Sequence, residues 1–364
     1  IARELENLYA AEFGADILKI GEQQILELYL QMVDPSLVPQ GEKLLDRGLR
    51  AFWEIFTEPQ GPGDRFLDAY FEQEKNTLEQ DLKGLVNDKP FYALARFVAL
   101  MCAQEPFGIY KSGDLGNLKH LENKEVYEHY ETLMGEHPTD IFCVGPNLED
   151  VASLFASLIP KRAHTIELRE PKKVQVNEER FFEETMDLNQ AIVVMGYRTN
   201  CSYRDNDYYA LLVGNGILGG FAHSKLFMNV REKASLAYSV GSHIEGSKGL
   251  LTITAGISDD QQEKALAIIG DQVTACQAGQ ISPDELEQTK RGLISAMISL
   301  GDSPAGIIDR NLIGVVEGEM RTIDQVVEAI RRVEHDDCVR VMERIQLDTT
   351  YLLRPGNTEN TRDE

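Results

Sequence analysis

The spacing of apolar residues predicts a mainly helical first half of the chain with a short β-hairpin near its start. An opening helix is predicted at residues 1–8, and residues 13–20 and 24–33 have the composition of two strands around a turn at Gly21. Apolar residues then recur at helical intervals, interrupted by Pro and Gly. The predicted helices are 44–56, 64–86 with Asp64 as its cap, 91–103, 123–134 and 147–158, and a strand is predicted at 139–144.

The second half shows a different alternation of strands and helices. Residues 191–198 are almost all apolar and predict a buried strand, and residues 237–244 and 250–257 predict a hairpin. Four helical stretches follow, and the second begins with the capping sequence Ser282-Pro-Asp-Glu285. These stretches are 261–278, 282–300, 305–316 and 322–344, after which a strand at 349–353 closes the half.

The two halves also resemble each other in the order and spacing of their elements. The sequence EQEKNTL at 72–78, followed by Pro90, parallels EQTKRGL at 287–293, followed by Pro304. Each half then continues through two helical segments to its last strand. A long internal match of this kind indicates two tandem copies of one α+β unit. The expected organisation is a first domain at 1–162, a charged linker at 163–180, a second domain at 181–356 and a disordered tail at 357–364.

The acidic composition of the chain limits the kinds of molecule that it can be expected to bind. The 364 residues carry 36 Lys and Arg against 60 Asp and Glu, a formal net charge of −24. This charge repels nucleic acids and anionic lipid surfaces, and no apolar run approaches the roughly 20 residues that span a bilayer. We therefore expect no nucleic-acid or membrane partner. Partners should be neutral or basic, although a solubilising surface is the favoured explanation of the acidity.

Cysteine usage predicts a reducing, cytoplasmic location. The five cysteines are scattered singly through apolar segments, with no C-x-x-C spacing, at 102, 143, 201, 276 and 338. An odd number of isolated cysteines in a chain of this length indicates reduced core thiols. The chain begins at Ile1 directly inside a helical pattern without a cap, so a preceding segment is expected.

The stretch from Leu211 to Tyr238 carries the clearest chemical signal. An apolar helix end runs into a glycine-rich loop, and a short amphipathic helix then leads to a β-like run. Gly214, Gly216 and Gly219 also satisfy the dinucleotide pattern G-x-G-x-x-G, which requires a strand immediately before it. Residues 208–213 instead follow a polar turn as a helix does, so nucleotide binding is disfavoured.

This stretch resembles the pitrilysin/insulysin superfamily, the inverted-motif zinc peptidases, which include the mitochondrial processing peptidases. Their C-terminal halves carry a pattern close to G-G-x-x-x-S-R-L-F-x-x-(L/I)-R-E-x-x-x-L-(A/G)-Y. Lys225 replaces the usual arginine after the serine. The matching residues are Gly219, Gly220, Ser224, Leu226, Phe227, Arg231, Glu232, Leu236 and Tyr238.

The resemblance implies a fold and a site. The fold would be α+β, with two tandem homologous domains, each an antiparallel sheet covered on one face by helices, which together form half of a clamshell. Arg231 and Tyr238 would reach the active site of an opposing domain, and Gly219, Gly220 and Ser224 would form the substrate loop. A guanidinium offers several donors to carbonyl oxygens, and a phenol can stabilise an oxyanion. Without the resemblance, Arg231 is a solvated helix charge and Tyr238 a strand aromatic.

The metal site of the superfamily is not matched in this sequence. Catalytic members carry H-x-x-E-H on a helix, with a glutamate as third zinc ligand. Neither H-x-x-E-H nor H-E-x-x-H occurs here, and none of the seven histidines lies four residues from another. The third-ligand position holds Asp81, seven residues after Glu74, and its side chain is one methylene shorter than that of glutamate. We expect a degenerate metal position and no cofactor in this chain.

Three functions remain open. The first is a catalytically degenerate, substrate-binding subunit of a heterodimeric zinc peptidase, in which Arg231 and Tyr238 serve a partner with H-x-x-E-H; bacterial non-catalytic subunits that retain this pair are the nearest resemblance. The second is an active zinc peptidase whose metal helix lies upstream of Ile1, with zinc bound by that segment. The third is an assembly protein of the same fold. A homodimer is the alternative to the heterodimer, and peptides are the expected substrates.

Overall fold

The computed structural model describes residues 6–39, 41–146, 148–159 and 173–356, which belong to two compact units. The first unit comprises Ile1–Lys19, Gln23–Gly84 and Lys111–Arg169. The second comprises Ile20–Glu22, Leu85–Tyr110 and Glu170–Glu364. The predicted tail at 357–364 lies outside the described residues, as do most of the predicted opening helix and much of the predicted linker.

The first unit combines the predicted hairpin with helices. The hairpin is confirmed as β1 (Glu12–Ile20) and β2 (Gln23–Gln31). The long helix begins at Asp68 and not at the predicted cap Asp64, because Asn123 fixes the preceding loop. The side-chain oxygen of Asn123 accepts a hydrogen bond from the Phe66 N–H at 3.0 Å, and the side-chain nitrogen of Asn123 donates one to the Phe66 carbonyl at 2.9 Å. The helices are α2 (Gly41–Thr57), α3 (Asp68–Gly84), α5 (Leu115–His120), α6 (Asn123–Glu136) and α7 (Leu148–Leu158), and η1 is Pro35–Leu37.

The strand predicted at 139–144 is wrong. These residues have no regular secondary structure, and Ile141 and Val144 are exposed. A strand needs a hydrogen-bonded neighbour, and in the described part of the first unit the only sheet is the β1–β2 pair. The last-strand correspondence between the two halves is therefore not observed.

The second unit is built on a mixed five-stranded sheet in the order β3-β7-β4-β6-β5. An antiparallel sheet was predicted, but β3 runs parallel to β7 while the other pairs are antiparallel. β3 was not predicted, since its residues RFFEETM do not alternate between apolar and polar and the surrounding sequence is charged. The strands are β3 (Arg180–Met186), β4 (Ala191–Arg198), β5 (Ala237–Glu245), β6 (Leu250–Ile257) and β7 (Gln346–Pro355).

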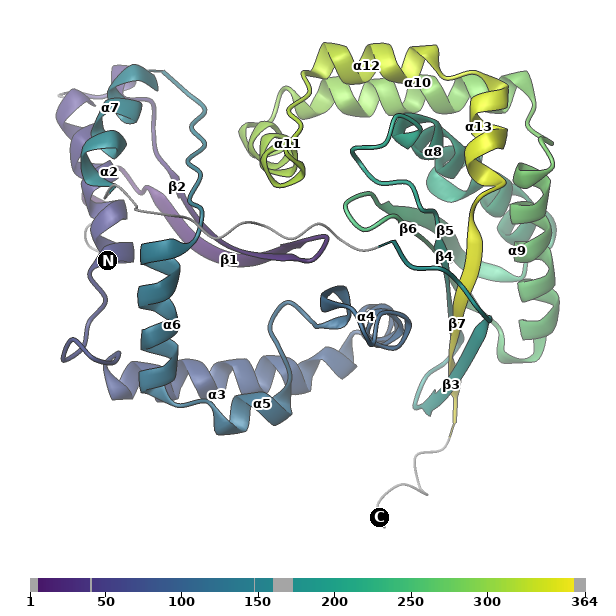
Figure 1. The fold of residues 1–364 in the computed structure, drawn as a ribbon, viewed down its shortest axis with the longest axis horizontal. Coiled ribbons are helices and arrows are strands. Elements are labelled where there is room, and N and C mark those ends of the chain that lie inside the picture. Colours follow the sequence, from purple (N-terminus) through teal and green to yellow (C-terminus); the bar gives the residue numbers. More distant parts are fainter. Residues whose placement is uncertain (1–5, 40, 147, 160–172, 357–364) are drawn as a thin grey trace. The chain divides into compact units, whose positions relative to one another are not determined.

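Helices cover both faces of this sheet, and not one face as predicted (Figure 1). All eight residues of β4 are buried, because alternate side chains enter two different cores. Val193 and Met195 pack in the larger core with α8, α9, α12 and α13, whereas Ile192 and Val194 pack with α4. The helices are α4 (Lys89–Met101), α8 (Tyr208–Asn215), α9 (Gln262–Gln277), α10 (Pro283–Leu300), α11 (Pro304–Glu317), α12 (Ile323–Arg332) and α13 (His335–Met342); η2 is Leu85–Asn87, η3 Pro106–Gly108 and η6 Asp259–Gln261.

A buried network of ion pairs connects strand ends and turns on the α4 side of the sheet. Arg198, at the end of β4, contacts Glu105 at 2.6 Å and Asp348 at 2.8 Å. Lys248, in the β5–β6 turn, contacts Glu105 at 2.6 Å and also pairs with Glu22. Asp348 pairs in addition with Arg180. Three cations therefore balance three carboxylates, which is what permits these charges to be buried.

The network favours the ionised carboxylates. Burial opposes ionisation of Glu105, but hydrogen bonds from Arg198 and Lys248 outweigh it, so the pKa of Glu105 is lowered. Burial likewise opposes ionisation of Asp348, and hydrogen bonds from Arg180, Arg198 and Thr349 lower its pKa overall. The unfolded chain therefore binds more protons than the folded chain in mildly acidic solution. This part of the stability is present above the unfolded-state pKa values and is lost as pH falls through the lower folded-state values.

Replacement of Arg198 tests the network. Arg198→Met leaves Glu105 and Asp348 without their shared cation, and we expect the free energy of unfolding in urea to fall by about 3–5 kcal/mol. The free energy of unfolding of this variant should also depend less steeply on pH in acidic solution. The matched control is Arg332→Met, which breaks the exposed pair with Glu328 and should cost under about 1 kcal/mol. Equal losses for the two variants would show that the buried network does not stabilise the unit.

Candidate functional site

The motif identified in the sequence forms two consecutive π-helices between α8 and β5. The predicted helix at 208–213 is confirmed as α8, so no strand precedes the glycines and the dinucleotide pattern is not met. α8 continues into η4 (Gly216–Gly220), and the predicted amphipathic helix is mostly η5 (Phe227–Lys233), also a π-helix. π-helices are rare and occur frequently at functional sites.

Gly219 allows the loop to approach β5. A Cβ atom on Gly219 would lie 2.5 Å from the Ser242 hydroxyl oxygen and 2.6 Å from the Ser242 backbone nitrogen, so no side chain fits there. Gly220 has no such restriction, since the nearest atom to an added Cβ belongs to Asn215 at 3.6 Å. Ser224 is fully buried and accepts the Phe227 N–H at 3.4 Å, which connects the loop to the start of η5.

Side chains that the sequence pattern did not single out anchor this loop to α10. The rings of Phe221 and His223 stack with centroids 5.2 Å apart, and His223 Nε2 lies 2.9 Å from the hydroxyl of buried Thr289. Lys225, which replaces the arginine of the pattern, pairs with Glu285 at 2.8 Å. Burial opposes ionisation of Glu285, but hydrogen bonds from Lys225 and Ser282 lower its pKa overall. The loop is thus fixed by an aromatic stack and an ion pair.

Arg231 lies in the last turn of η5 and is partly exposed. Its guanidinium carbon is 4.7 Å from the centroid of the Phe227 ring, a cation–π geometry. The nearest carboxylate oxygen, on Glu232, is 3.8 Å from Nε, which is too far for a hydrogen bond. Phe227 therefore orients the guanidinium, while its N–H donors make no hydrogen bond within the described residues.

Tyr238 lies at a β-bulge in β5, which is an edge strand of the sheet. Ala237 pairs with Ile257 and Ser239 with Gly256, so Tyr238 is the extra residue on its strand. Its side chain is 81% exposed, whereas the neighbouring Ala237 is buried. A bulge can redirect a side chain in this way. The phenol is consequently directed into solvent from a fixed backbone.

The turn between η5 and β5 holds the two candidate residues on adjoining elements. Leu236 N–H donates to the Val230 carbonyl at 3.0 Å, and Ser235 adopts a left-handed conformation with φ of 52°. The arrangement offers N–H donors and one phenol hydroxyl. These groups can bind carbonyl oxygens and stabilise a developing oxyanion, but neither is a base that activates water.

The degenerate metal position does not form a zinc site. Glu74 and Asp81 both lie on α3 in the first unit, and both are exposed. Over the described ranges, no three His, Cys, Asp or Glu side chains are grouped so that they could hold a metal ion. Structural and catalytic zinc sites use at least three protein ligands. The residues that the structure describes therefore do not offer the three ligands that zinc requires.

Four of the five thiols match the predicted core positions. Cys102, Cys201, Cys276 and Cys338 are buried, and burial raises the pKa of each to about 12. Cys143 is exposed, so the prediction of a core thiol is wrong there, since the strand predicted around it does not form. All five are free cysteines. In the part of the chain that the structure covers, no helix is both long and apolar enough to cross a bilayer.

Comparison with known proteins places these features in one family. Residues 120–293 match the family described as "Peptidase M16 inactive domain". The chain is 32% identical over 355 residues to "Probable inactive metalloprotease YmfF" of Bacillus subtilis, covering 96% of this chain and 83% of that protein. It is 26% identical over 187 residues to the mitochondrial-processing peptidase subunit alpha of Caenorhabditis elegans, covering 47% of this chain and 36% of that subunit.

A solved structure agrees with the sequence relatives. The crystal structure of a conserved protein from Enterococcus faecalis superposes with a TM-score of 0.89 at 28% identity, and the match covers 99% of this chain and 85% of that one. The resemblance to the inverted-motif zinc peptidases is thereby confirmed. The chain belongs to the M16 peptidase family and resembles members that are described as inactive.

Proposed function

We propose that this chain is the substrate-binding subunit of a heterodimeric zinc peptidase. Arg231 would hold the backbone of a peptide, and Tyr238 would donate a hydrogen bond to the oxyanion that forms at the partner's zinc. The partner would carry H-x-x-E-H and supply the metal and the base. Gly219, Gly220 and Ser224 would form the loop beside the peptide.

The exposure of the Tyr238 side chain is the main support for this proposal. A tyrosine that only filled a strand position would pack its ring against a neighbour, because aromatic rings gain most from burial. This ring is 81% exposed at a bulge of an edge strand, next to an element that presents a guanidinium. Both side chains are available to a molecule outside the unit, as a site shared with a partner requires.

Several broader features belong to the same proposal. The relative from Caenorhabditis elegans is named as a subunit of a processing peptidase, which supports association with a second subunit; a homodimer is the alternative. The chain would be two tandem domains, at 1–162 and 181–356 with a linker at 163–180, forming half of a clamshell. The location would be cytoplasmic, and the substrates would be short or unfolded peptides.

Two other functions remain as alternatives. An active zinc peptidase would need H-x-x-E-H upstream of Ile1, and even then Asp81 would have to replace a longer ligand. An assembly protein of the same fold would have no use for an exposed Tyr238 beside Arg231. The substrate-binding subunit accounts for both the degenerate metal position and the exposed pair.

Zinc content distinguishes the first two functions. We expect the full-length protein, purified without its partner, to hold no stoichiometric zinc by elemental analysis, because the described residues contain no group of three ligands. Asp81→Glu restores the longer side chain and should still hold none, since one ligand cannot replace a set. A tightly held zinc ion in every chain would identify an active peptidase instead.

Tyr238→Phe tests the oxyanion donor. The variant keeps the ring but removes the hydroxyl, so folding and assembly with the partner should be unchanged. In the reconstituted heterodimer, kcat for peptide hydrolysis should fall about 100-fold or more, as for other oxyanion donors. Tyr70→Phe, which removes a hydroxyl from an exposed tyrosine on α3, is the control. Full turnover by Tyr238→Phe in an active complex would remove Tyr238 from the site.

Arg231→Ala should act on binding as well as on turnover. A guanidinium that contacts the peptide backbone binds the ground state, so its loss should raise KM and lower kcat/KM. The control is Arg332→Ala, which removes an exposed arginine from α12. A fall in kcat with KM unchanged would assign Arg231 a role in the transition state alone and contradict the proposed backbone contact.

A further inference from the structure

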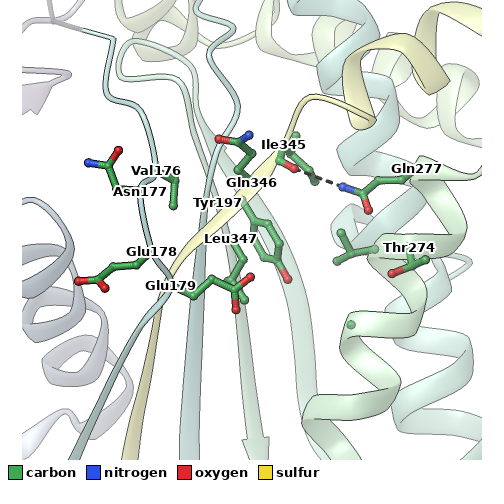
Figure 2. A pocket seen from close by; sticks show the side chains of 12 residues that line it. Val176, Asn177, Glu178, Glu179, Tyr197, Thr274, Gln277, Ile345, Gln346 and Leu347 are labelled. Carbon is green, nitrogen blue, oxygen red and sulfur yellow. Dashed lines mark hydrogen bonds between the residues drawn. The ribbon is translucent and has the colours of Figure 1, made fainter.

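A pocket in the second unit lies on the larger-core side of the sheet, between α9 and the first residues of β7. Its volume is about 510 Å³, within the usual range for small-molecule sites. Tyr197 and Leu347 form its floor, α9 contributes Thr274 and Gln277, and the segment that leads into β3 contributes Glu179 (Figure 2). β3 begins to pair with β7 only at Arg180 and Thr349, so the sheet is open at this point.

The polar side chains that line this pocket include the acceptors of Glu179 and Gln277. Glu179 has no ion-pair partner within the described residues. The amide nitrogen of Gln277 donates to the Ile345 carbonyl at 3.2 Å, which leaves the amide oxygen as the free group. The Tyr197 side chain is only 4% exposed and lines the pocket, and its hydroxyl makes no hydrogen bond with any described residue. Burial and the Glu179 carboxylate raise its pKa. The hydroxyl is therefore available to a ligand that enters the pocket.

Gly270 provides an independent indication that the space is kept open. It lies within α9 at the pocket wall, and a Cβ built there would meet no atom within 4 Å. Its backbone is helical, so neither a close contact nor a positive φ requires glycine. Glycine destabilises a helix relative to alanine. The helix nevertheless has glycine at this position, so the pocket wall carries no side chain there.

We propose that this pocket binds a cationic group on an aliphatic stem, a primary ammonium or a guanidinium. Glu179 and the Gln277 amide oxygen would accept its N–H donors, and Tyr197 Oη would accept another. The stem would pack on Val176, Val273 and Leu347, which line the same space. The formal net charge of −24 raises the local concentration of such cations.

This site is separate from the Arg231 and Tyr238 pair. β3 and β5 are the two edges of the five-stranded sheet, so the pocket beside β3 and the phenol on β5 belong to opposite edges. Cation binding here does not depend on a zinc partner. The two proposals can therefore fail independently.

The test is calorimetric titration of the full chain with three probes: the capped tripeptide Ala-Lys-Ala, its norleucine counterpart, and n-butylamine. We expect the lysine peptide to bind and the uncharged norleucine peptide not to bind. Binding of n-butylamine as well would assign the site to any aliphatic amine, whereas binding of the peptide alone would assign it to a basic side chain within a chain. Failure of both cationic probes to bind at millimolar concentration would overturn the proposal.

Four variants locate the binding. Glu179→Gln should weaken binding about tenfold or more, because a charge-assisted hydrogen bond is lost. Glu263→Gln removes an equal charge from an exposed side chain in the first turn of α9, outside the pocket lining, and should change binding no more than about twofold. Gly270→Met should abolish binding by filling the space, while Gly270→Ala should retain it. Both substitutions favour the helix, so unfolding would not explain a loss.

The remaining outcomes are equally decisive. An equal effect of Glu263→Gln and Glu179→Gln would show that the probes are attracted by the general surface charge and not by the pocket. Unchanged binding by Gly270→Met would place the probes outside the pocket. Equal affinity for the lysine and norleucine peptides would remove the requirement for a cation. Each of these results overturns the assignment.

Discussion

The second unit depends on the balanced charges buried between α4 and its sheet. Arg198 and Lys248 share the carboxylate of Glu105, and Asp348 joins Arg198 to Arg180. These contacts connect the last residue of β4 with the first residues of β7 and β3. They also include the β5–β6 turn and the segment after α4. Loss of any one cation leaves the network with one more negative than positive charge in a poorly hydrated place. The network therefore fixes the strand ends from which both edges of the sheet extend.

A rigid sheet with helices on both faces explains how exposed groups can still be well positioned. Tyr238 is solvated, but Ala237 before it is buried and the bulge sets its direction. Arg231 is likewise exposed, but Phe227 lies against its guanidinium. Preorganised donors of this kind suit electrostatic stabilisation of a reaction whose base and metal lie elsewhere. The pocket beside Gly270 uses the opposite edge of the same sheet.

The sequence predicted local elements well where one pattern dominated. The continuous apolar run at 191–198 became β4, and the Ser282 capping box began α10. The junction carrying Arg231 and Tyr238 was also predicted, together with its glycine loop. Their shared role remains a prediction, because it concerns a second molecule and not this fold.

The elements that were predicted wrongly or missed have one physical feature in common. Whether each of them forms depends on residues that are distant in the sequence. The strand predicted at 139–144 has strand-like composition but no neighbour with which to pair. β3 has an ambiguous pattern and forms because β7, about 170 residues later, lies beside it. The hydrogen bond between Arg198 and Asp348 joins residues 150 positions apart, and no local sequence pattern predicts it. The π-helices and the space beside Gly270 likewise follow from packing.

The central claim is that this chain completes the active site of another subunit. The most direct measurement is the rate of peptide hydrolysis by the H-x-x-E-H subunit at a fixed concentration, as the wild-type chain is added. We expect little activity from either protein alone and a rate that rises to a plateau at one chain per partner. Full activity of the H-x-x-E-H subunit by itself, unchanged by addition of this chain, would contradict it.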